Sequence, residues 1–499
     1  MTLIKRSFIL CLFTILWSIN YAQWTTIEGD APAYKGKEML AFGYTDFISD
    51  RMEWLGRTTV DSSGHFLLKI SCDEIRYIGL RTDHVTGFMY ISPDASYTIE
   101  FPVPSDGVSI TFNDRAQTDI LFKDLGLEDI NSLIIDFNER YEGFFAQNYQ
   151  LLQRLFSPSN RANDVDSIAS SARSPAIGGM GQLMERMESF IVLMDAVYKE
   201  FDNAYFKTYR KASLGDLLMN GRLDDRRAFY DRFIAPVEFN SQHKAQSELE
   251  QRFFEDYFLN FARTREDETL AEILNQRGSY ADLFELLGKD DFLADPFRRN
   301  RTIVSAISEV WSNKSMQKHR LASILDSLGH RSWDSESRRL GLNALYVLSS
   351  MDDGFPAYDF KLTDQFNEGL SPSGFKGKPI VLEFWASWCT ACDKERAIFS
   401  ALADAYQGRI QFISINMDDA PMKENISAGP ILHGHGIDDP TLKEVYHVMT
   451  LPQYTLIDRD GLIYDAFTMS PSAGLEAYLT ALTGDEAKPY KPVVGSKEN

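Results

Sequence analysis

The stretch FWASWCTACDKE, residues 384–395, constrains the fold of this chain more than any other feature. It places Cys389 and Cys392 three residues apart, after the apolar run PIVLEF and before a charged, helix-like segment. Unpaired N–H groups and the dipole at a helix amino end stabilise an anion, so we expect Cys389 to be the more acidic and exposed thiol. Its thiolate can attack a disulfide, and Cys392, one turn further in, can displace the product. The pattern predicts thiol–disulfide chemistry.

Two structural roles for the cysteine pair are less well supported than a role in disulfide exchange. An inert disulfide across this spacing closes so small a loop that it removes little entropy from the unfolded chain. A zinc site needs four ligands, and the one close histidine pair, His433 and His435, has no third ligand at metal spacing. We expect these histidines in a polar loop between a strand and a helix, and we expect no metal and no cofactor. Cys72 is expected to be a packed thiol.

The amino terminus has the pattern of a secretory signal peptide. Lys5 and Arg6 precede an apolar run that ends shortly before Ala22. We expect cleavage after Ala22, which removes residues 1–22 and places the protein in the periplasm. An uncleaved anchor is disfavoured because the run is shorter than the ~20 apolar residues that span a bilayer. Lipid attachment at Cys11 is disfavoured because this cysteine lies inside the apolar run. The formal net charge of -21 disfavours nucleic acid as a partner.

The remaining chain is too long for one core, since domains usually run ~100–200 residues. Alternating, β-branched stretches over residues 24–115 predict an antiparallel, sandwich-like β domain. Apolar residues at steps of three and four over residues 116–345 predict an all-α region, with a loop at 170–181. Strand and helix signals alternate over residues 353–485, which predicts an α/β domain. Residues 486–499 are expected to be a flexible tail.

The α/β region has identifiable elements. We expect strands at 379–384, 410–416 and 453–458, a hairpin partner at 462–467 and a last helix at 472–482. The helix after the cysteine pair is expected to turn Ile398, Leu402, Ala405 and Tyr406 to the core. This arrangement predicts a mixed sheet flanked by helices, with the cysteine pair where a strand ends and a helix begins.

Longer stretches of this region resemble a known family. The segments GKPIVLEFWASWCTAC, DKE and YHVMTLPQYTLIDRDGLI, together with ILHGHGIDDPTLKEVYHV, resemble the TlpA-like thioredoxin family of periplasmic thiol–disulfide reductases, some of which serve cytochrome c maturation. The resemblance covers about the last quarter of the chain. It implies a thioredoxin fold, protein disulfides as substrates and a membrane electron donor for re-reduction. The β and helical regions in front resemble modular envelope proteins of Bacteroidetes.

The resemblance also implies roles for individual residues. Cys389 matches the nucleophile and Cys392 the resolving cysteine. Glu383 matches a buried acid that moves a proton at the inner cysteine, and burial would raise its pKa enough for this task. Glu395 matches an acid thought to tune the inner thiol. A surface charge paired with a lysine is an equally good interpretation of Glu395.

A second group of matching residues faces the substrate in the family. Pro452 matches a proline held in the cis form, whose geometry lets the backbone of Leu451 pair with an extended substrate segment. An ordinary trans turn proline is the alternative. Trp388 resembles the tryptophan that shapes the substrate surface, and Trp385 is expected to pack in the core.

Some positions depart from the family pattern, and several functions stay open. Ala391 stands where proline usually precedes the inner cysteine, Ala397 replaces a helix-kinking proline, and Thr450 replaces a frequent glycine. These changes leave the redox potential undetermined, so an oxidase or isomerase is the alternative to a reductase. A third hypothesis is an envelope binding module whose thioredoxin unit only presents a client. A peroxidase is disfavoured because its Thr-x-x-Cys arrangement is missing here.

Overall fold

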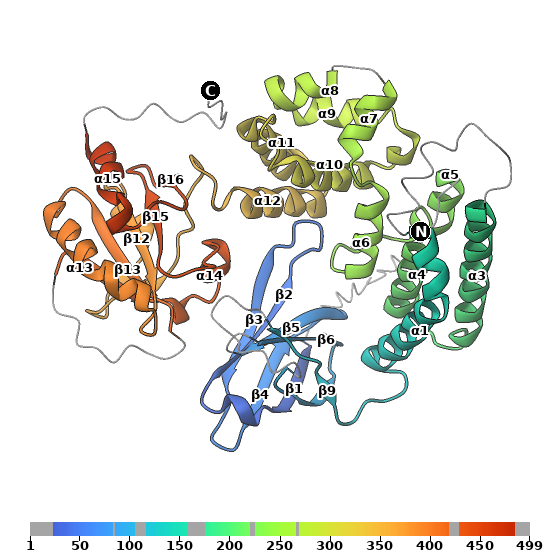
Figure 1. Cartoon of the computed structure of the whole chain (residues 1–499). Helices are drawn as coiled ribbons and strands as arrows, with labels where there is room; N and C mark the ends of the chain where they lie inside the picture. Colours follow the sequence, from blue (N-terminus) through green and yellow to red (C-terminus); the bar gives the residue numbers. More distant parts are fainter. Residues whose placement is uncertain are drawn as a thin grey trace, which may run out of the picture.

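The computed structural model arranges the chain as a β region, a helical region and an α/β region in sequence order (Figure 1). This order of fold types confirms the sequence prediction. No helix in the described ranges is long and apolar enough to cross a membrane. The expected signal peptide and the tail at 486–499 lie outside the described residues. The structure describes residues 23–82, 85–104, 116–156, 175–219, 225–265, 269–418 and 429–484.

The β region is built from β1 (Trp24–Asp30), β2 (Glu38–Tyr44), β3 (Met52–Thr59), β4 (His65–Ser71), β5 (Arg76–Thr82), β6 (Val85–Ile91), β7 (Ser96–Glu100), β8 (Ala116–Gln117) and β9 (Leu121–Phe122). One sheet has the order β4-β1-β7-β9 and the other β3-β2-β5-β6-β8. Buried and exposed residues alternate along β7, as expected for a strand with one face on a core. The pairs β1–β7 and β6–β8 are parallel, so the region is not purely antiparallel.

The strands continue past the boundary expected at residue 115, because β8 and β9 follow it. Each of these strands has only two residues, which is too short for any periodicity to appear in the sequence. The β region therefore extends to Phe122.

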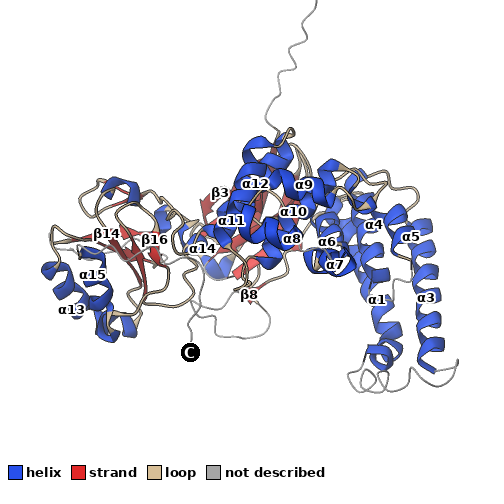
Figure 2. Ribbon diagram, turned by 90° about the horizontal axis from the view of Figure 1, so that it is seen from above, coloured by secondary structure: helices blue, strands red, loops and turns tan. Residues whose placement is uncertain are grey.

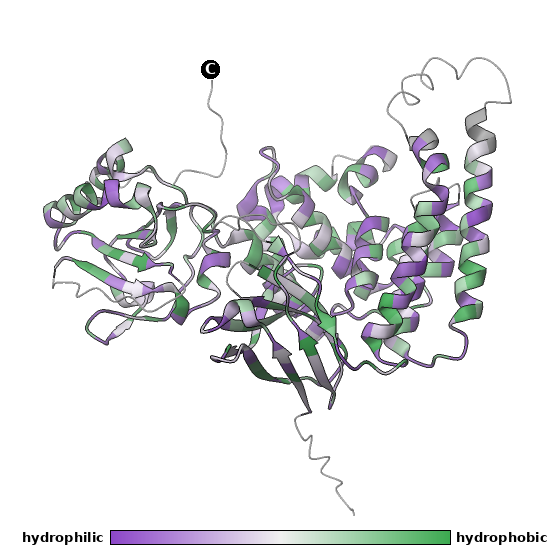
Figure 3. Ribbon diagram, turned by 60° about the horizontal axis from the view of Figure 1, so that its bottom comes forward, coloured by the Kyte–Doolittle hydropathy of each residue, from purple (hydrophilic) through white to green (hydrophobic). Residues whose placement is uncertain are grey.

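The helical region contains α1 (Ile130–Phe156), α3 (Pro175–Val197), α4 (Ala204–Met219), α5 (Arg226–Phe229), α6 (Lys244–Phe253), α7 (Tyr257–Arg265), α8 (Thr269–Glu272), α9 (Tyr280–Leu287), α10 (Pro296–Val310), α11 (Lys318–Arg331) and α12 (Ser335–Ser349). Hydrophobic and hydrophilic residues alternate along these helices (Figure 3). The core is rich in aromatic side chains, including the fully buried Phe137, Phe206 and Phe253. The last helix continues beyond the expected boundary at 345.

The loop expected at 170–181 is wrong in its second half. Helix α3 begins at Pro175 and includes the glycines that suggested a loop, while residues 170–174 lie outside the described residues. Proline is well tolerated in the first turn of a helix, and packing against a neighbour overrides a weak local propensity. That neighbour is α1, which lies beside α3 (Figures 1 and 2).

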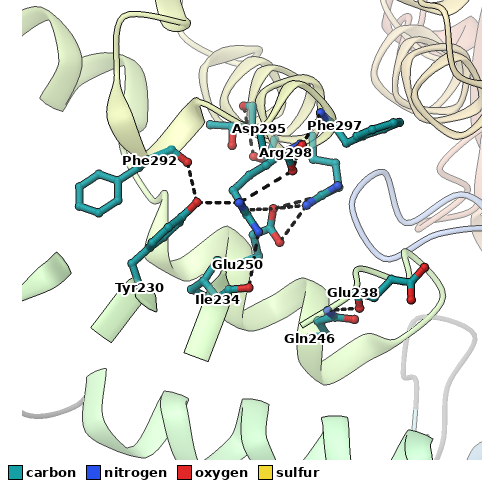
Figure 4. Close-up of polar contacts among 12 residues, drawn as sticks. Tyr230, Ile234, Glu238, Gln246, Glu250, Phe292, Asp295, Phe297 and Arg298 are labelled. Carbon is teal, nitrogen blue, oxygen red and sulfur yellow. Dashed lines mark hydrogen bonds and ion pairs between the residues drawn. The ribbon is translucent and has the colours of Figure 1, made fainter. Parts of the chain in front are cut away.

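A buried ion network joins α6 to α10 (Figure 4). Arg301 donates from Nε and Nη2 to the two carboxylate oxygens of Glu250 at 3.1 and 3.3 Å. Arg298 Nε lies 3.7 Å from Glu250 Oε1, and Arg298 Nη1 donates to the Tyr230 hydroxyl at 2.6 Å. Asp295 adds a second carboxylate 3.8 Å from Arg298. Since the side chains of Glu250 and both arginines are less than a tenth exposed, each charge depends on the others for its neutralisation.

The α/β region contains β10 (Leu362–Thr363), β11 (Gly369–Leu370), β12 (Ile380–Trp385), α13 (Thr390–Ala405), β13 (Gln411–Asn416), β14 (Ile431–His435), α14 (Leu442–Val445), β15 (Gln453–Ile457), β16 (Ile463–Asp465) and α15 (Leu475–Thr483). Its main sheet has the order β14-β13-β12-β15-β16, with β12, β13 and β14 parallel and the last two strands antiparallel. Helices α13 and α15 pack with Val381 on one face, and α14 packs with Leu382 on the other. The strand predicted at 379–384 is β12, which lies at the centre of this sheet, and the predicted hairpin is confirmed.

The inner face of α13 differs from the sequence prediction. Ile398 and Ala405 are exposed, whereas Phe399 and Ala403 are buried beside the correctly predicted Leu402 and Tyr406. Ile398 is 40% exposed and Phe399 is 1% exposed. Helical spacing alone places both residues near the same face, and only packing against β12 and β13 decides which of the two side chains enters the core.

The connection between β2 and β3 fastens the β region to the helices. The buried carboxylate of Asp46 accepts hydrogen bonds from Ser49 N at 2.6 Å and from Asn343 Nδ2 of α12 at 2.7 Å. Arg51 donates to Asn343 Oδ1 at 2.8 Å. The same hairpin also contacts the α/β region, because β3 lies beside α14 (Figures 1 and 2), where Trp54 Nε1 donates to Thr441 Oγ1 at 2.9 Å.

Candidate active site

The cysteine pair lies between the end of β12 and the start of α13. Cys389 is the N-cap of α13 and forms a disulfide with Cys392. The backbone N–H of Cys392 donates to Cys389 Sγ at 3.1 Å. A sulfur that accepts a hydrogen bond at a helix amino end is stabilised as a thiolate once the disulfide is reduced. The local geometry therefore favours Cys389 over Cys392 as the attacking sulfur.

Both cysteines are more buried than the sequence led us to expect. Cys389 is 5% exposed and Cys392 is 2% exposed in the disulfide form. The expectation of an exposed Cys389 is therefore wrong for this state, although Cys389 is the less buried of the two. Trp385 and the partly buried Leu451 pack around the pair. Leu451 is more than fifty residues from the cysteines in sequence, so nothing in the sequence around the cysteine pair indicates that Leu451 packs against it.

Glu383 is buried under the site, on the same face of β12 as Val381 and therefore on the side of α13. Ser414 Oγ donates to its Oε2 at 2.6 Å, and the Tyr454 hydroxyl donates to its Oε1 at 3.3 Å. Burial raises the pKa of Glu383, and the two hydroxyl groups and nearby Arg396 oppose that rise without cancelling it. A raised pKa keeps this carboxyl group protonated over a wider pH range, which suits a group that takes up and returns a proton.

Replacing Glu383 with glutamine should change how stability depends on pH. The raised pKa means that the folded protein holds a proton that the unfolded chain has already lost, so wild-type stability falls as pH rises from the usual glutamate range to the folded pKa. Urea unfolding should show Glu383→Gln close to wild type at pH 4 and more stable at pH 8. Disulfide exchange at pH 7 should slow roughly 10²-fold if this group moves the proton. Glu476→Gln, which changes an exposed glutamate of α15, is the matched control, and equal pH profiles for Glu383→Gln and wild type would contradict the assignment.

Glu395 has a structural partner that neither sequence interpretation included. Its carboxylate accepts from Ser472 N at 2.9 Å and from Ser472 Oγ at 2.5 Å, and Ser470 Oγ donates to it at 3.3 Å. Ser472 lies in a short 3-10 helix, Pro471–Ala473, that precedes α15. The carboxylate therefore ties the first turns of α13 to the segment before α15.

The residues expected to face a substrate come from two segments of the chain, the cysteine loop and the loop before β15. The Leu451–Pro452 peptide bond is cis, as the sequence predicted, and Leu451 packs against the cysteine pair. Trp388 is 56% exposed beside Cys389, whereas Trp385 is buried, with the Arg396 guanidinium 4.7 Å from its ring centre. The exposed indole of Trp388 therefore forms an apolar surface next to the nearly buried sulfur of Cys389.

Sequence reasoning missed three residues that support the site. Ser414 and Tyr454 hold Glu383, and Asp418 accepts from the backbone N–H of Ser387 at 3.0 Å, two residues before Cys389. Ser414 did leave a signal, because a polar residue in the buried run IQFISIN needs a partner inside the protein. Asp418 left none.

The expected loop around His433 and His435 is a strand instead, since both lie on β14. His433 is desolvated, which lowers its pKa to about 4, and His435 Nδ1 accepts from Ile437 N at 3.3 Å. Within the described ranges, no group of three His, Cys, Asp or Glu side chains is placed to hold a metal ion. Alternation is hard to see in a strand of five residues that contains a glycine.

A disulfide at a strand–helix junction, a buried acid beneath it, and a cis proline beside it in a mixed sheet define the class of thioredoxin-fold proteins. Comparison with known proteins agrees with this class. The model of the AhpC/TSA family matches residues 354–471. The thiol-disulfide oxidoreductase ResA of Bacillus thuringiensis subsp. konkukian is 30% identical over 138 residues, which cover 27% of this chain and 80% of that protein.

Other relatives match the same region. The thioredoxin-like protein YneN of Bacillus subtilis is 29% identical over 124 residues, covering 23% of this chain and 71% of YneN. The crystal structure of a putative thiol-disulfide oxidoreductase from Bacteroides vulgatus aligns with 29% identity and a TM-score of 0.24, covering 27% of this chain and 99% of that one. Through its C-terminal domain, the chain belongs to the TlpA-like family of thioredoxin-fold thiol–disulfide oxidoreductases.

Proposed function

We propose that the protein is a periplasmic oxidoreductase that reduces protein disulfides through Cys389-Thr-Ala-Cys392. The observation that carries the proposal is the hydrogen bond from Cys392 N to Cys389 Sγ at the start of α13, since it favours a thiolate at the outer sulfur. The leader pattern of residues 1–22 supports the periplasmic location.

The reaction has two exchange steps. The Cys389 thiolate attacks one sulfur of a client disulfide, which forms a mixed disulfide and releases the other client sulfur as a thiolate. Cys392 then loses its proton, to Glu383 in this proposal, and attacks Cys389 Sγ. The client leaves with two thiols and the enzyme keeps the Cys389–Cys392 disulfide. A membrane electron donor must return two electrons for the next cycle.

The other predicted residues have supporting roles. Trp388, Leu451 and Pro452 form the surface that meets the client, and Glu395 keeps α13 in place through Ser472. In this proposal, residues 353–485 carry out the disulfide exchange. Residues 24–115 and 116–345, with the short β extension described above, are assigned to recognition or placement of the client.

Trapping with Cys392→Ser tests this proposal. Without the resolving sulfur, the first step should stop at the mixed disulfide, so adducts linked through Cys389 should accumulate in periplasmic extracts. Non-reducing electrophoresis and mass spectrometry would detect them and name the clients. The double variant Cys389→Ser/Cys392→Ser is the matched control. If Cys392→Ser forms no more adducts than the double variant, the chain is a binding module and not a catalyst.

A redox titration of the cysteine pair tests whether the protein reduces or oxidises its clients. Thioredoxin-like pairs range from about -270 mV for reductants to about -120 mV for oxidants. We expect a value near the reducing end, measured in glutathione or dithiothreitol buffers by the fraction of alkylated protein. A value near the oxidising end would instead support an oxidase or isomerase.

A further inference from the structure

A row of four polar side chains crosses the main sheet beneath the active site. Glu383 on β12 pairs with Tyr454 on β15 and with Ser414 on β13, and Ser414 pairs in turn with His433 on β14. Paired residues of neighbouring strands place their side chains on the same face of a sheet. The residues two positions away in the four strands pack in the core between the sheet and helices α13 and α15: Val381, Phe412, Ile431 and Leu456. The polar row therefore faces α13 as well.

Hydrogen bonds join three of these side chains inside the protein. Ser414 Oγ donates to Glu383 Oε2 at 2.6 Å, and the Tyr454 hydroxyl donates to Oε1 at 3.3 Å. Glu383, Ser414 and Tyr454 are each less than a tenth exposed. His433, in contrast, is partly exposed and lies on the edge strand β14. Along this row, a proton on Glu383 can reach the surface only through Ser414 and His433.

The imidazole ring of His433 has a buried nitrogen that no other group uses. Its Nδ1 has no hydrogen-bond partner among the described residues. Most buried polar atoms have a partner, so an atom without one calls for an explanation. Ser414 is the paired residue on the next strand, and neighbouring strands lie ~4.8 Å apart. A rotation of the Ser414 hydroxyl and the ring can therefore bring Oγ and Nδ1 into hydrogen-bond contact.

The surroundings of His433 keep its ring neutral. Loss of water around the ring and the positive charge of Arg396 on α13 lower the pKa of His433 to about 4. The same guanidinium opposes the rise that burial causes in the pKa of Glu383, as expected if both groups face α13. A neutral imidazole can accept a proton at one nitrogen while it releases one from the other. His433 is therefore suited to pass a proton on and not to keep it.

We propose that Ser414 and His433 are positioning residues that carry the Cys392 proton from Glu383 to solvent. When Cys392 attacks Cys389 Sγ, the bond between the two cysteines forms, the client sulfur leaves as a thiolate, and the Cys392 proton passes to the Glu383 carboxylate. The protonated acid then donates to Ser414 Oγ, the former hydroxyl proton moves to His433 Nδ1, and Nε2 releases a proton to water.

The transfer leaves every group in its starting charge state. Glu383 is again a carboxylate, Ser414 is a hydroxyl, and His433 is neutral with its proton on Nδ1. Re-reduction of the disulfide returns a proton to Cys392 along the same path, which moves the His433 proton back to Nε2. This inference rests on the proposed function, and in particular on the proton step at Glu383.

Single-turnover kinetics test the proposal. The reduced full chain without its leader is mixed with a glutathionylated peptide, and quenched-flow alkylation with mass spectrometry follows the mixed disulfide and the Cys389–Cys392 disulfide separately. At pH 7, His433→Ala should form the mixed disulfide at the wild-type rate and resolve it at least about tenfold more slowly. This loss is smaller than the roughly 10²-fold loss expected for Glu383→Gln, because the proton can still leave slowly by other routes.

Imidazole added to the buffer separates proton transfer from a loss of packing. It should restore resolution in His433→Ala in proportion to its concentration, because the free base can occupy the vacated space beside Ser414. His433→Gln fills that space but cannot transfer a proton, so it should be slow at every imidazole concentration. Ser414→Ala should also resolve slowly and should gain nothing from imidazole.

The matched control is His435→Asn on the same strand. Asparagine keeps an acceptor for the Ile437 N–H that His435 Nδ1 binds, so this variant should resolve the mixed disulfide at the wild-type rate. Resolution at the wild-type rate in His433→Ala or His433→Gln would overturn the assignment, as would a slow rate in His433→Ala that imidazole does not restore. Failure of the proposed function looks different: wild type would form no mixed disulfide, or Glu383→Gln would resolve it as fast as wild type.

Discussion

Cys389→Ser should abolish disulfide reduction, lowering kcat/KM for a glutathionylated peptide by at least about 10⁴-fold, as removal of a catalytic nucleophile does elsewhere. A serine hydroxyl at this position stays protonated at neutral pH and cannot exchange with a disulfide. The two cysteines act as a unit, so Cys389→Ser/Cys392→Ser should lose no more activity than the single variant.

The control for this prediction is Cys72→Ala. Cys72 is buried in the β region, where its thiol donates to Glu74 O at 2.9 Å, and its loss should leave activity within about twofold of wild type. Brief reduction and alkylation of the wild-type protein should label Cys389 first, because it is the less buried member of the pair. If Cys389 resists both mild reductant and alkylation, its 5% exposure does not admit a client and the enzymatic proposal fails.

The largest effect on stability is expected at Glu250. Glu250→Ala leaves Arg298 and Arg301 without their shared carboxylate inside the helical region, which should cost about 3–5 kcal/mol of the free energy of unfolding. Urea unfolding followed by circular dichroism, which reports mainly on the helices, would measure the loss. The weaker Arg298–Asp295 contact at 3.8 Å cannot replace the two hydrogen bonds from Arg301.

Glu248→Ala provides the matched control on the same helix. Its carboxylate pairs with Lys244 on an exposed surface, and such pairs contribute about 0.3–0.5 kcal/mol. If Glu250→Ala were no more destabilising than Glu248→Ala, the arginines would have to reach water or other partners, and the network would not hold the helical region together. Exchange activity of the folded fraction should be unchanged, since α6, which carries Glu250, lies far from α13, which begins at the cysteine pair (Figure 1).

Much of the α/β fold was predictable because its signals are local. The run 379–384 is uniformly apolar apart from Glu383, as a strand covered on both faces must be, and the turn at Asp460-Gly461 joins two strands that pair directly. The shortest strands and the start of α3 were missed or misassigned for the opposite reason. Their sequences are too short or too rich in glycine to indicate a structure, and distant partners decide it.

The sequence by itself determined the chemistry: two sulfurs at the amino end of a helix, an acid in an apolar strand, and a proline that could be identified by its neighbours. Tertiary structure decided how that chemistry is used. It covered Cys389 with Leu451, gave Glu383 the hydroxyls of Ser414 and Tyr454, and joined Glu395 to Ser472. Residue type and spacing act within one or two turns of chain, whereas burial and pairing depend on residues that only folding brings together.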